Sequence, residues 1–166
     1  EWEIKLLRNI QKLASLGISR LSRAWQIIMK GYDEIKNAPN IKIVRIASRV
    51  PFHDPERINN TMLEMFSDFS DFRLELGTHI NHPVEFWKES VESLKKLQSV
   101  GFRIYNQNPL LKGVNDNFQT LSELYSNLRD YDIESHYLFH AVPLRGMSHH
   151  RTSVKKGIDL SNALSS

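Results

Sequence analysis

The chain has 166 residues, of which 40% are hydrophobic and 25% charged, and its formal net charge is +3 at pH 7. This composition suffices for one domain with a buried core, and the modest, dispersed positive charge does not favour nucleic acid as a partner. The absence of cysteine excludes disulfides, thiolate metal ligands and cysteine nucleophiles within these residues. No apolar run approaches the roughly 18 residues of a membrane span, and no signal-peptide pattern is present, so we expect a cytoplasmic protein with no membrane partner.

Two helical patterns open the chain. Residues 2–16 predict an amphipathic helix, which makes segment 1–19 an extra N-terminal element of uncertain placement, and residues 21–35 predict a helix that leads into the first strand. No linker or low-complexity segment interrupts the sequence, so we expect a single domain over residues 1–166. Because the chain begins without methionine and ends inside a helical pattern, we expect it to be a piece of a longer protein.

Short β-rich apolar runs then recur about every thirty residues, which is roughly the length of one βαβ unit. They occupy residues 41–46 (IKIVRI), 72–78 (FRLELGT), 102–105 (FRIY) and 135–139 (SHYLF). Helical patterns fill the gaps between these runs. Alternation of this kind predicts an α/β fold with a parallel sheet, either an open doubly wound sheet or a partial (β/α) barrel.

The predicted helices carry recognisable start and stop signals. Thr61-x-x-Glu64 and Asp116-x-x-Gln119 have the form of capping boxes, and Pro83 suits the first turn of the helix that follows the second strand. Gly101 is a plausible stop for that helix. A final helix is predicted over residues 154–164.

Every predicted strand is followed by polar residues at its carboxyl end, where parallel α/β folds place their functional sites. These residues are Ser48 and Arg49, then His79, Asn81 and His82, then Asn106, Gln107 and Asn108, and lastly His140. Asn and His in such loops commonly cap helices instead of binding ligands, and both interpretations stay open for His82 beside Pro83. A histidine metal site is disfavoured, because no carboxylate completes the set and His149 and His150 suit a solvated loop.

Four stretches in order resemble motifs of a known family. IKIVRIASRVP, THINHPVE, NQNPLLKGVND and HHRTSVKKG resemble the motifs VRIGSRxP, THFNHPxE, NQxVLLxGVND and HFRTxVxxG of the lysine 2,3-aminomutase family of radical S-adenosylmethionine (SAM) enzymes. The resemblance covers about residues 20–165. It implies a partial (β/α) barrel of the radical SAM type, with hydrogen abstraction and amino-group migration on a small amino acid or aminoacyl substrate.

The resemblance also implies cofactors and site residues. S-adenosylmethionine and a [4Fe–4S] cluster are implied by the family, and pyridoxal phosphate is a further cofactor of its true aminomutases. The residues that match the family's cofactor-binding motifs are Ser48, Arg49, His79, Asn81, His82, Gln107 and Phe139. A planar Arg fork suits a carboxylate or phosphate, which places Arg49 with Gln107 among the first candidates.

The departures from the family pattern are equally specific. The cluster motif CxxxCxxC and the GGD segment are absent, so these residues cannot hold the cluster, and the pyridoxal lysine of the family lies downstream of the matched stretch. Val142 aligns with the acidic residue that contacts the distal amine of lysine, which makes lysine a doubtful substrate, and Phe139 aligns with a tyrosine. A homologue without a cluster that binds a small molecule or a partner, and an ordinary α/β domain, are the alternatives. Self-association into a homo-oligomer is compatible with all of them.

Overall fold

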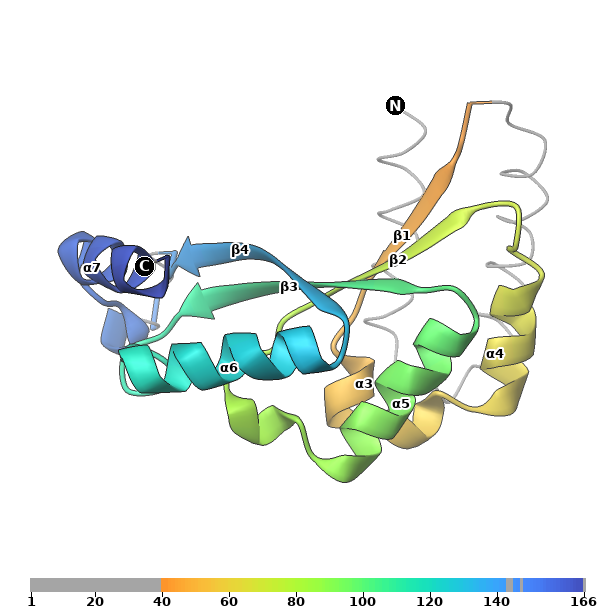
Figure 1. Cartoon of the computed structure of the whole chain (residues 1–166), viewed down its shortest axis with the longest axis horizontal. Coiled ribbons are helices and arrows are strands. Elements are labelled where there is room, and N and C mark those ends of the chain that lie inside the picture. The colour runs from red at the N-terminus through yellow and green to blue at the C-terminus, as the bar shows by residue number, and fades with distance from the viewer. Residues whose placement is uncertain (1–39, 143–144, 147, 166) are drawn as a thin grey trace.

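The computed structural model describes residues 40–142, 145–146 and 148–165, and in this part of the chain four strands form one parallel sheet (Figure 1). The strands are β1 (Ile43–Ala47), β2 (Arg73–Thr78), β3 (Arg103–Leu110) and β4 (Ile133–His140), and they lie side by side in chain order. The α/β class predicted from the sequence is therefore confirmed. The helices predicted over residues 2–16 and 21–35 lie outside the described residues.

Helices connect the strands and lie largely on one face of the sheet. They are α3 (Val50–His53), α4 (Asn60–Ser67), α5 (Lys88–Ser99), α6 (Phe118–Asp130) and α7 (Val154–Leu164), with short 3-10 turns at Pro55–Arg57, Pro83–Glu85 and Ser148–His150. Figure 1 shows α4, α5 and α6 along the same side of the sheet. Sequential strand order with helices on one side is the arrangement of a barrel segment, whereas a doubly wound sheet carries helices on both faces. The four strands of the described part do not close into a barrel. None of the described helices has the length and apolar character needed to cross a membrane.

The core lies between the sheet and these helices. Alternate residues of the strands enter it, such as Leu74 and Leu76 of β2 and Ile104 of β3, each at most 3% exposed. From the helices, Leu94 of α5 and Leu124 of α6 are buried against them. The period-2 and period-3.6 apolar patterns of the sequence thus meet in one contiguous layer.

The strand lengths differ from the prediction, most of all in β3. The expected strand ended at Tyr105, but β3 continues through Asn106, Gln107 and Asn108 to Leu110. Asn106 and Asn108 are fully buried, and each makes hydrogen bonds through its side chain. Polar side chains that find hydrogen-bond partners inside the fold can lie within a strand. The polar residues Asn106 and Asn108 therefore did not indicate a loop.

Both predicted capping boxes are wrong by one or two residues. Helix α4 has Asn59 as its N-cap, whose side chain accepts from the Met62 N–H, and Thr61 lies inside the helix. Helix α6 is capped by Asn117, which accepts from the Thr120 N–H. In each case an asparagine one or two residues away, which is at least as strong an N-cap, competes with the predicted residue.

The segment after β2 also differs, because Pro83 starts a 3-10 turn and not the long helix. The turn covers Pro83–Glu85, and α5 begins only at Lys88 after the extended residue Trp87. The predicted stop is confirmed: Gly101 has a φ of +92° and its N–H donates to the Gln98 carbonyl. The bounds predicted for the last helix, residues 154–164, match α7.

Candidate functional site

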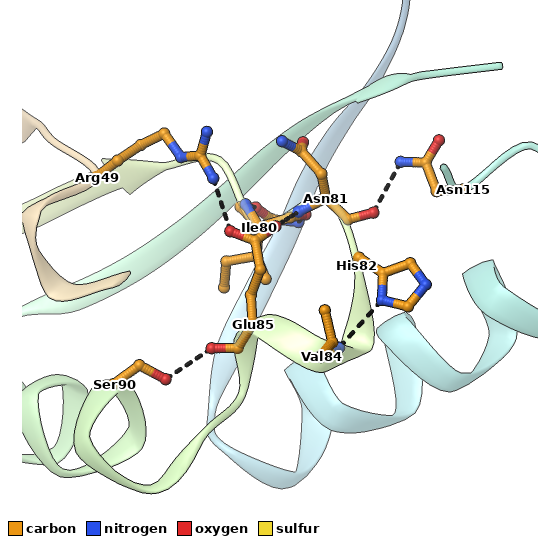
Figure 2. A network of polar contacts seen from close by, with 9 residues as sticks. Arg49, Ile80, Asn81, His82, Val84, Glu85, Ser90 and Asn115 are labelled. Atoms are coloured by element: carbon orange, nitrogen blue, oxygen red, sulfur yellow. Dashed lines mark hydrogen bonds and ion pairs between the residues drawn. The ribbon is translucent and has the colours of Figure 1, made fainter. Parts of the chain in front are cut away.

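Residues 79–82, the loop that leaves β2, lie at the carboxyl end of the sheet and are held by side chains from other elements (Figure 2). Glu85 uses both carboxylate oxygens for this purpose. Oε1 accepts from the Asn81 N–H at 2.7 Å, and Oε2 accepts from Arg49 Nη2 at 2.6 Å. Charge-assisted hydrogen bonds are the stronger class, so Glu85 joins the end of β1 firmly to the loop after β2.

Two buried asparagines fix the same loop from beneath. The Asn106 side chain accepts from the Ile80 N–H at 2.7 Å and donates to the Ile80 carbonyl at 3.1 Å. The Asn115 side chain donates to the Asn81 carbonyl at 2.9 Å and accepts from the Leu111 N–H at 2.7 Å. Both asparagines are fully buried. The backbone groups of the loop therefore bond to fixed side chains, on β3 and on the segment that precedes α6, instead of to water.

His82 acts as a cap. Its Nδ1 accepts from the Val84 N–H at 3.1 Å, so the neutral ring carries its proton on Nε2. Figure 2 shows this ring on the side of the loop away from Arg49. This hydrogen bond thus supports the capping interpretation of His82.

Ser48 also has a local structural role. Its N–H continues the sheet ladder by donating to the Gly77 carbonyl at 3.0 Å. Its Oγ accepts from the Val50 N–H at 3.1 Å, two residues further on. This turn aims the chain from β1 into α3 and leaves Arg49, the next residue, to reach Glu85.

His79 is exposed at the same rim, beside Arg49. Partial desolvation lowers the pKa of the His79 imidazole below its ordinary value, and the positive charge of Arg49 lowers it further. Both effects disfavour the imidazolium. His79 therefore offers a neutral ring, able to donate from one nitrogen and accept at the other, at neutral pH.

Two polar atoms of this rim are buried without a hydrogen-bond partner, namely Arg49 Nε and Asn81 Oδ1. In Figure 2 the Asn81 amide and the Arg49 guanidinium lie on the same side of the loop. Buried polar groups are nearly always paired, so we take this unpaired donor and this unpaired acceptor as candidate contacts for a polar ligand.

Gln107 and Phe139 lie farther along the sheet. Gln107 follows an irregularity in the β3–β4 register and pairs with Tyr137, and Phe139 pairs with Pro109. The rings of Tyr137 and Phe139 are 5.6 Å apart, and both are substantially exposed on the sheet face away from the core. The structure thus gathers Arg49, His79 and Asn81 at one place, with Gln107 and Phe139 on the neighbouring strands.

The residues that organise the rim were absent from the predicted set. Glu85, Asn106 and Asn115 make its longest-range hydrogen bonds. The sequence placed Asn106 among the polar residues at the strand ends, but it counted none of the three among the cofactor-binding residues. The signal was available, because all three fall inside the quoted stretches THINHPVE and NQNPLLKGVND. At the β4 end, His140 Nε2 lies 3.0 Å from the Thr152 carbonyl, and no group of three or more potential metal ligands occurs among the described residues.

Comparison with known proteins gives a consistent set of relatives, although no family model matches the chain. The L-lysine 2,3-aminomutase of Methanococcus maripaludis is 36% identical over 132 residues, which is 80% of this chain and 30% of that protein. The enzyme of the same name from Clostridium subterminale is 34% identical over 79% of this chain and 31% of its own length. The glutamate 2,3-aminomutase of Clostridioides difficile is 30% identical over 77% of this chain and 30% of its own length.

Among solved structures, a radical SAM methyltransferase from Sphaerobacter thermophilus matches 62% of this chain and 35% of its own, with 18% identity and a TM-score of 0.43. The chain spans about a third of the length of the curated relatives it matches. The resemblance to lysine 2,3-aminomutases seen in the four motifs is confirmed by these sequence matches, which extend over most of the chain.

Proposed function

We propose that this chain forms one wall of the cofactor and substrate cavity in a radical SAM enzyme that acts on an amino acid by hydrogen abstraction and amino-group migration. The observation that carries the proposal is the rim itself. Arg49, from the first family-like motif, and Asn81, from the second, come together there through Glu85, and each has a buried polar atom without a partner. The 2,3-aminomutase names of the relatives support the amino acid as the class of substrate.

The residues present fit S-adenosylmethionine better than they fit the cluster. A ligand rich in hydroxyl, amine and carboxylate groups would satisfy Arg49 Nε and Asn81 Oδ1, and the neutral imidazole of His79 adds a donor or an acceptor. When bound beside a reduced cluster, S-adenosylmethionine supplies the radical chemistry that starts hydrogen abstraction. A [4Fe–4S] cluster needs cysteine thiolates, and this stretch has none, so we assign these residues no part in holding it.

The part of this chain is then to bind, to orient and to exclude water. Glu85 holds the Arg49 guanidinium in one direction, and the two buried asparagines prevent the loop from shifting when a ligand binds. A site that is already organised loses less free energy to ordering on binding. Gln107, on the next strand, would offer its side-chain amide to the same ligand.

The test uses the protein encoded by the complete reading frame that contains this chain. We expect that reading frame to include a CxxxCxxC motif. The protein, reconstituted anaerobically with iron and sulfide and then reduced, should cleave S-adenosylmethionine to 5′-deoxyadenosine. Chromatography of amino acids incubated with it should show a shifted amino group. A reading frame without cysteines, together with no cleavage, would refute the proposal and favour a homologue that only binds small molecules.

Two variants, one at the rim and one on the surface of α6, test whether Arg49 binds S-adenosylmethionine. Arg49→Gln removes the charge but keeps a polar side chain, and we expect it to weaken S-adenosylmethionine binding by about tenfold or more, as for loss of a charge-assisted hydrogen bond. The control is Gln119→Ala on the exposed surface of α6, which should bind like the wild type. Equal affinity of Arg49→Gln and the wild type in calorimetry would remove Arg49 from the site.

A further inference from the structure

The turn between β3 and α6, residues 111–116, is bonded to the rim on one side and to the segment that leads into α7 on the other. On the rim side, the Asn115 amide donates to the Asn81 carbonyl at 2.9 Å (Figure 2). On the other side, the Lys112 N–H donates to the His150 carbonyl at 2.9 Å. One short turn therefore links the loop after β2 to the segment after β4.

Asp116 closes this turn and joins it to α7. Its Oδ1 accepts from the Gly113 N–H at 2.8 Å, and its Oδ2 accepts from Lys156 Nζ, across 40 positions of the chain. Gly113 has a φ of +75°, a left-handed conformation that favours glycine. The hydrogen bond from Lys156 lowers the pKa of the Asp116 carboxyl, and the bond from the Gly113 N–H lowers it further, so the group is ionised at neutral pH. One carboxylate thus fixes the turn and binds α7 at the same time.

Helix α7 lies close against the carboxyl ends of β3 and β4 (Figure 1). A Cβ added to Gly157 would lie 3.5 Å from Leu110 Cδ2 and 3.9 Å from His140 Cδ2, which belong to the last residues of the two strands. His140 Nε2 also lies 3.0 Å from the Thr152 carbonyl, just before the helix. An alanine would fit in place of Gly157, but a longer side chain would have to displace α7 or the buried Leu110.

The ion pair of Asp116 with Lys156 is poorly suited to stabilise the fold as a whole. The Lys156 side chain is 46% exposed, and ion pairs with an exposed partner contribute little to stability, because water and salt screen them. Its effect is on position, since it holds the turn that carries Asn115 against α7. The neighbouring Lys155 provides a contrast: it pairs with Asp159 within α7 and joins no other element.

We propose that Asp116 is a positioning residue of the rim, and that its ion pair with Lys156 couples the docking of α7 to the placement of the Asn81 carbonyl. The proposal rests on the proposed function, because the rim is where we expect S-adenosylmethionine to bind. Asp116 follows Asn115 directly, so a shift of Asp116 moves the amide that holds Asn81. A loop that is held in place before the ligand arrives loses less free energy to ordering on binding.

The direct test compares the two neighbouring lysines in the protein encoded by the complete reading frame. Lys156→Gln removes the ion pair between elements, whereas Lys155→Gln removes the pair within α7. Calorimetry should show S-adenosylmethionine binding weakened about two- to thirtyfold by Lys156→Gln and unchanged by Lys155→Gln, with both proteins melting near the wild type. Lys156→Arg keeps the charge and should restore most of the affinity. Equal affinity of Lys156→Gln and the wild type would overturn the proposal, and so would equal losses in the two glutamine variants.

Hydrogen exchange tests the same coupling without any ligand. The Leu111 N–H donates to Asn115 Oδ1 at 2.7 Å and so reports on the amide that holds the rim. Exchange at Leu111 should be faster in Lys156→Gln than in the wild type, and unchanged in Lys155→Gln. Gly157→Leu keeps every charge but displaces α7, so it should speed this exchange as well. Unchanged exchange at Leu111 in Lys156→Gln would overturn the proposal even if Gly157→Leu failed to fold.

The outcome is separable from that of the proposed function. Faster exchange at Leu111 in Lys156→Gln, in a protein that never binds or cleaves S-adenosylmethionine, would refute the proposed function and keep the positioning role of Asp116. Binding and cleavage of S-adenosylmethionine at the wild-type level in Lys156→Gln would do the reverse.

Discussion

The two faces of β2 differ in kind although they alternate along one six-residue strand. Toward the helices, Leu74 and Leu76 enter a core in which nearly all side chains are apolar. Toward the other side, Arg73 and Glu75 form an ion cluster, and the buried Gly77 has no side chain. The first face stabilises the fold through the burial of apolar side chains, whereas on the second face the desolvation of the buried carboxylate offsets most of the attraction within the ion cluster.

The largest expected effect on stability comes from making the same substitution, isoleucine to alanine, once on each face of the sheet. Ile104→Ala, at a core position 1% exposed, should lower the free energy of unfolding by about 2–5 kcal/mol, because burial is lost and a cavity is left. Ile43→Ala, on the open face and 44% exposed, should stay within about 1 kcal/mol of the wild type. Urea denaturation measures both, and similar losses would contradict the division of the sheet into two kinds of face.

The buried asparagines are among the polar side chains that the fold encloses. Asn106→Ala leaves the Ile80 N–H and carbonyl without their side-chain partner, which should cost about 1–3 kcal/mol in the free energy of unfolding. It should also speed hydrogen exchange at the Ile80 amide. The control is Asn162→Ala on an exposed position of α7, where the better helix former should be neutral or slightly stabilising. Unchanged exchange at Ile80 would show that Asn106 does not hold the loop.

A smaller effect tests the corrected start of α4. Asn59→Ala removes the N-cap that accepts from the Met62 N–H and should cost about 1 kcal/mol of stability. Thr61 is the second residue of α4, so Thr61→Ala should be neutral or stabilising, since alanine has the higher helix propensity. The opposite order in thermal melting would restore the capping box that the sequence suggested.

The smallest effect concerns the electrostatics of the rim. Because the pKa of His79 is lowered in the folded protein, the unfolded chain binds more protons as the pH falls below about 6.5, the ordinary value for histidine. His79 therefore destabilises the folded state progressively toward acidic pH and has no such effect above that range. An NMR titration of the His79 ring should show a midpoint below the ordinary value, and Arg49→Gln should raise that midpoint. A midpoint unaffected by Arg49→Gln would show that the charge of Arg49 does not act on the His79 ring.

Some features followed from local sequence alone. The four strands, the last helix and the stop at Gly101 were predictable, because apolar periodicity and glycine conformation act over a few residues. The ordered motifs also predicted the family resemblance that the relatives confirm. Local pattern could not choose between two candidate caps two residues apart, Asn59 and Thr61, because both residue types suit an N-cap and the helix start depends on packing.

Only the tertiary structure decided which residues organise the site. Glu85 contacts Arg49 across 36 positions, and Asn106 contacts Ile80 across 26, so no spacing within one element could reveal either pair. The same holds for the ion cluster of Glu75 with Arg45, 30 positions apart. Burial turns such polar residues from expected surface groups into paired ones, and pairing depends on strand register, which forms only when the sheet assembles. The sequence by itself thus determined the elements and the order of the motifs, while the parallel register brought their side chains together.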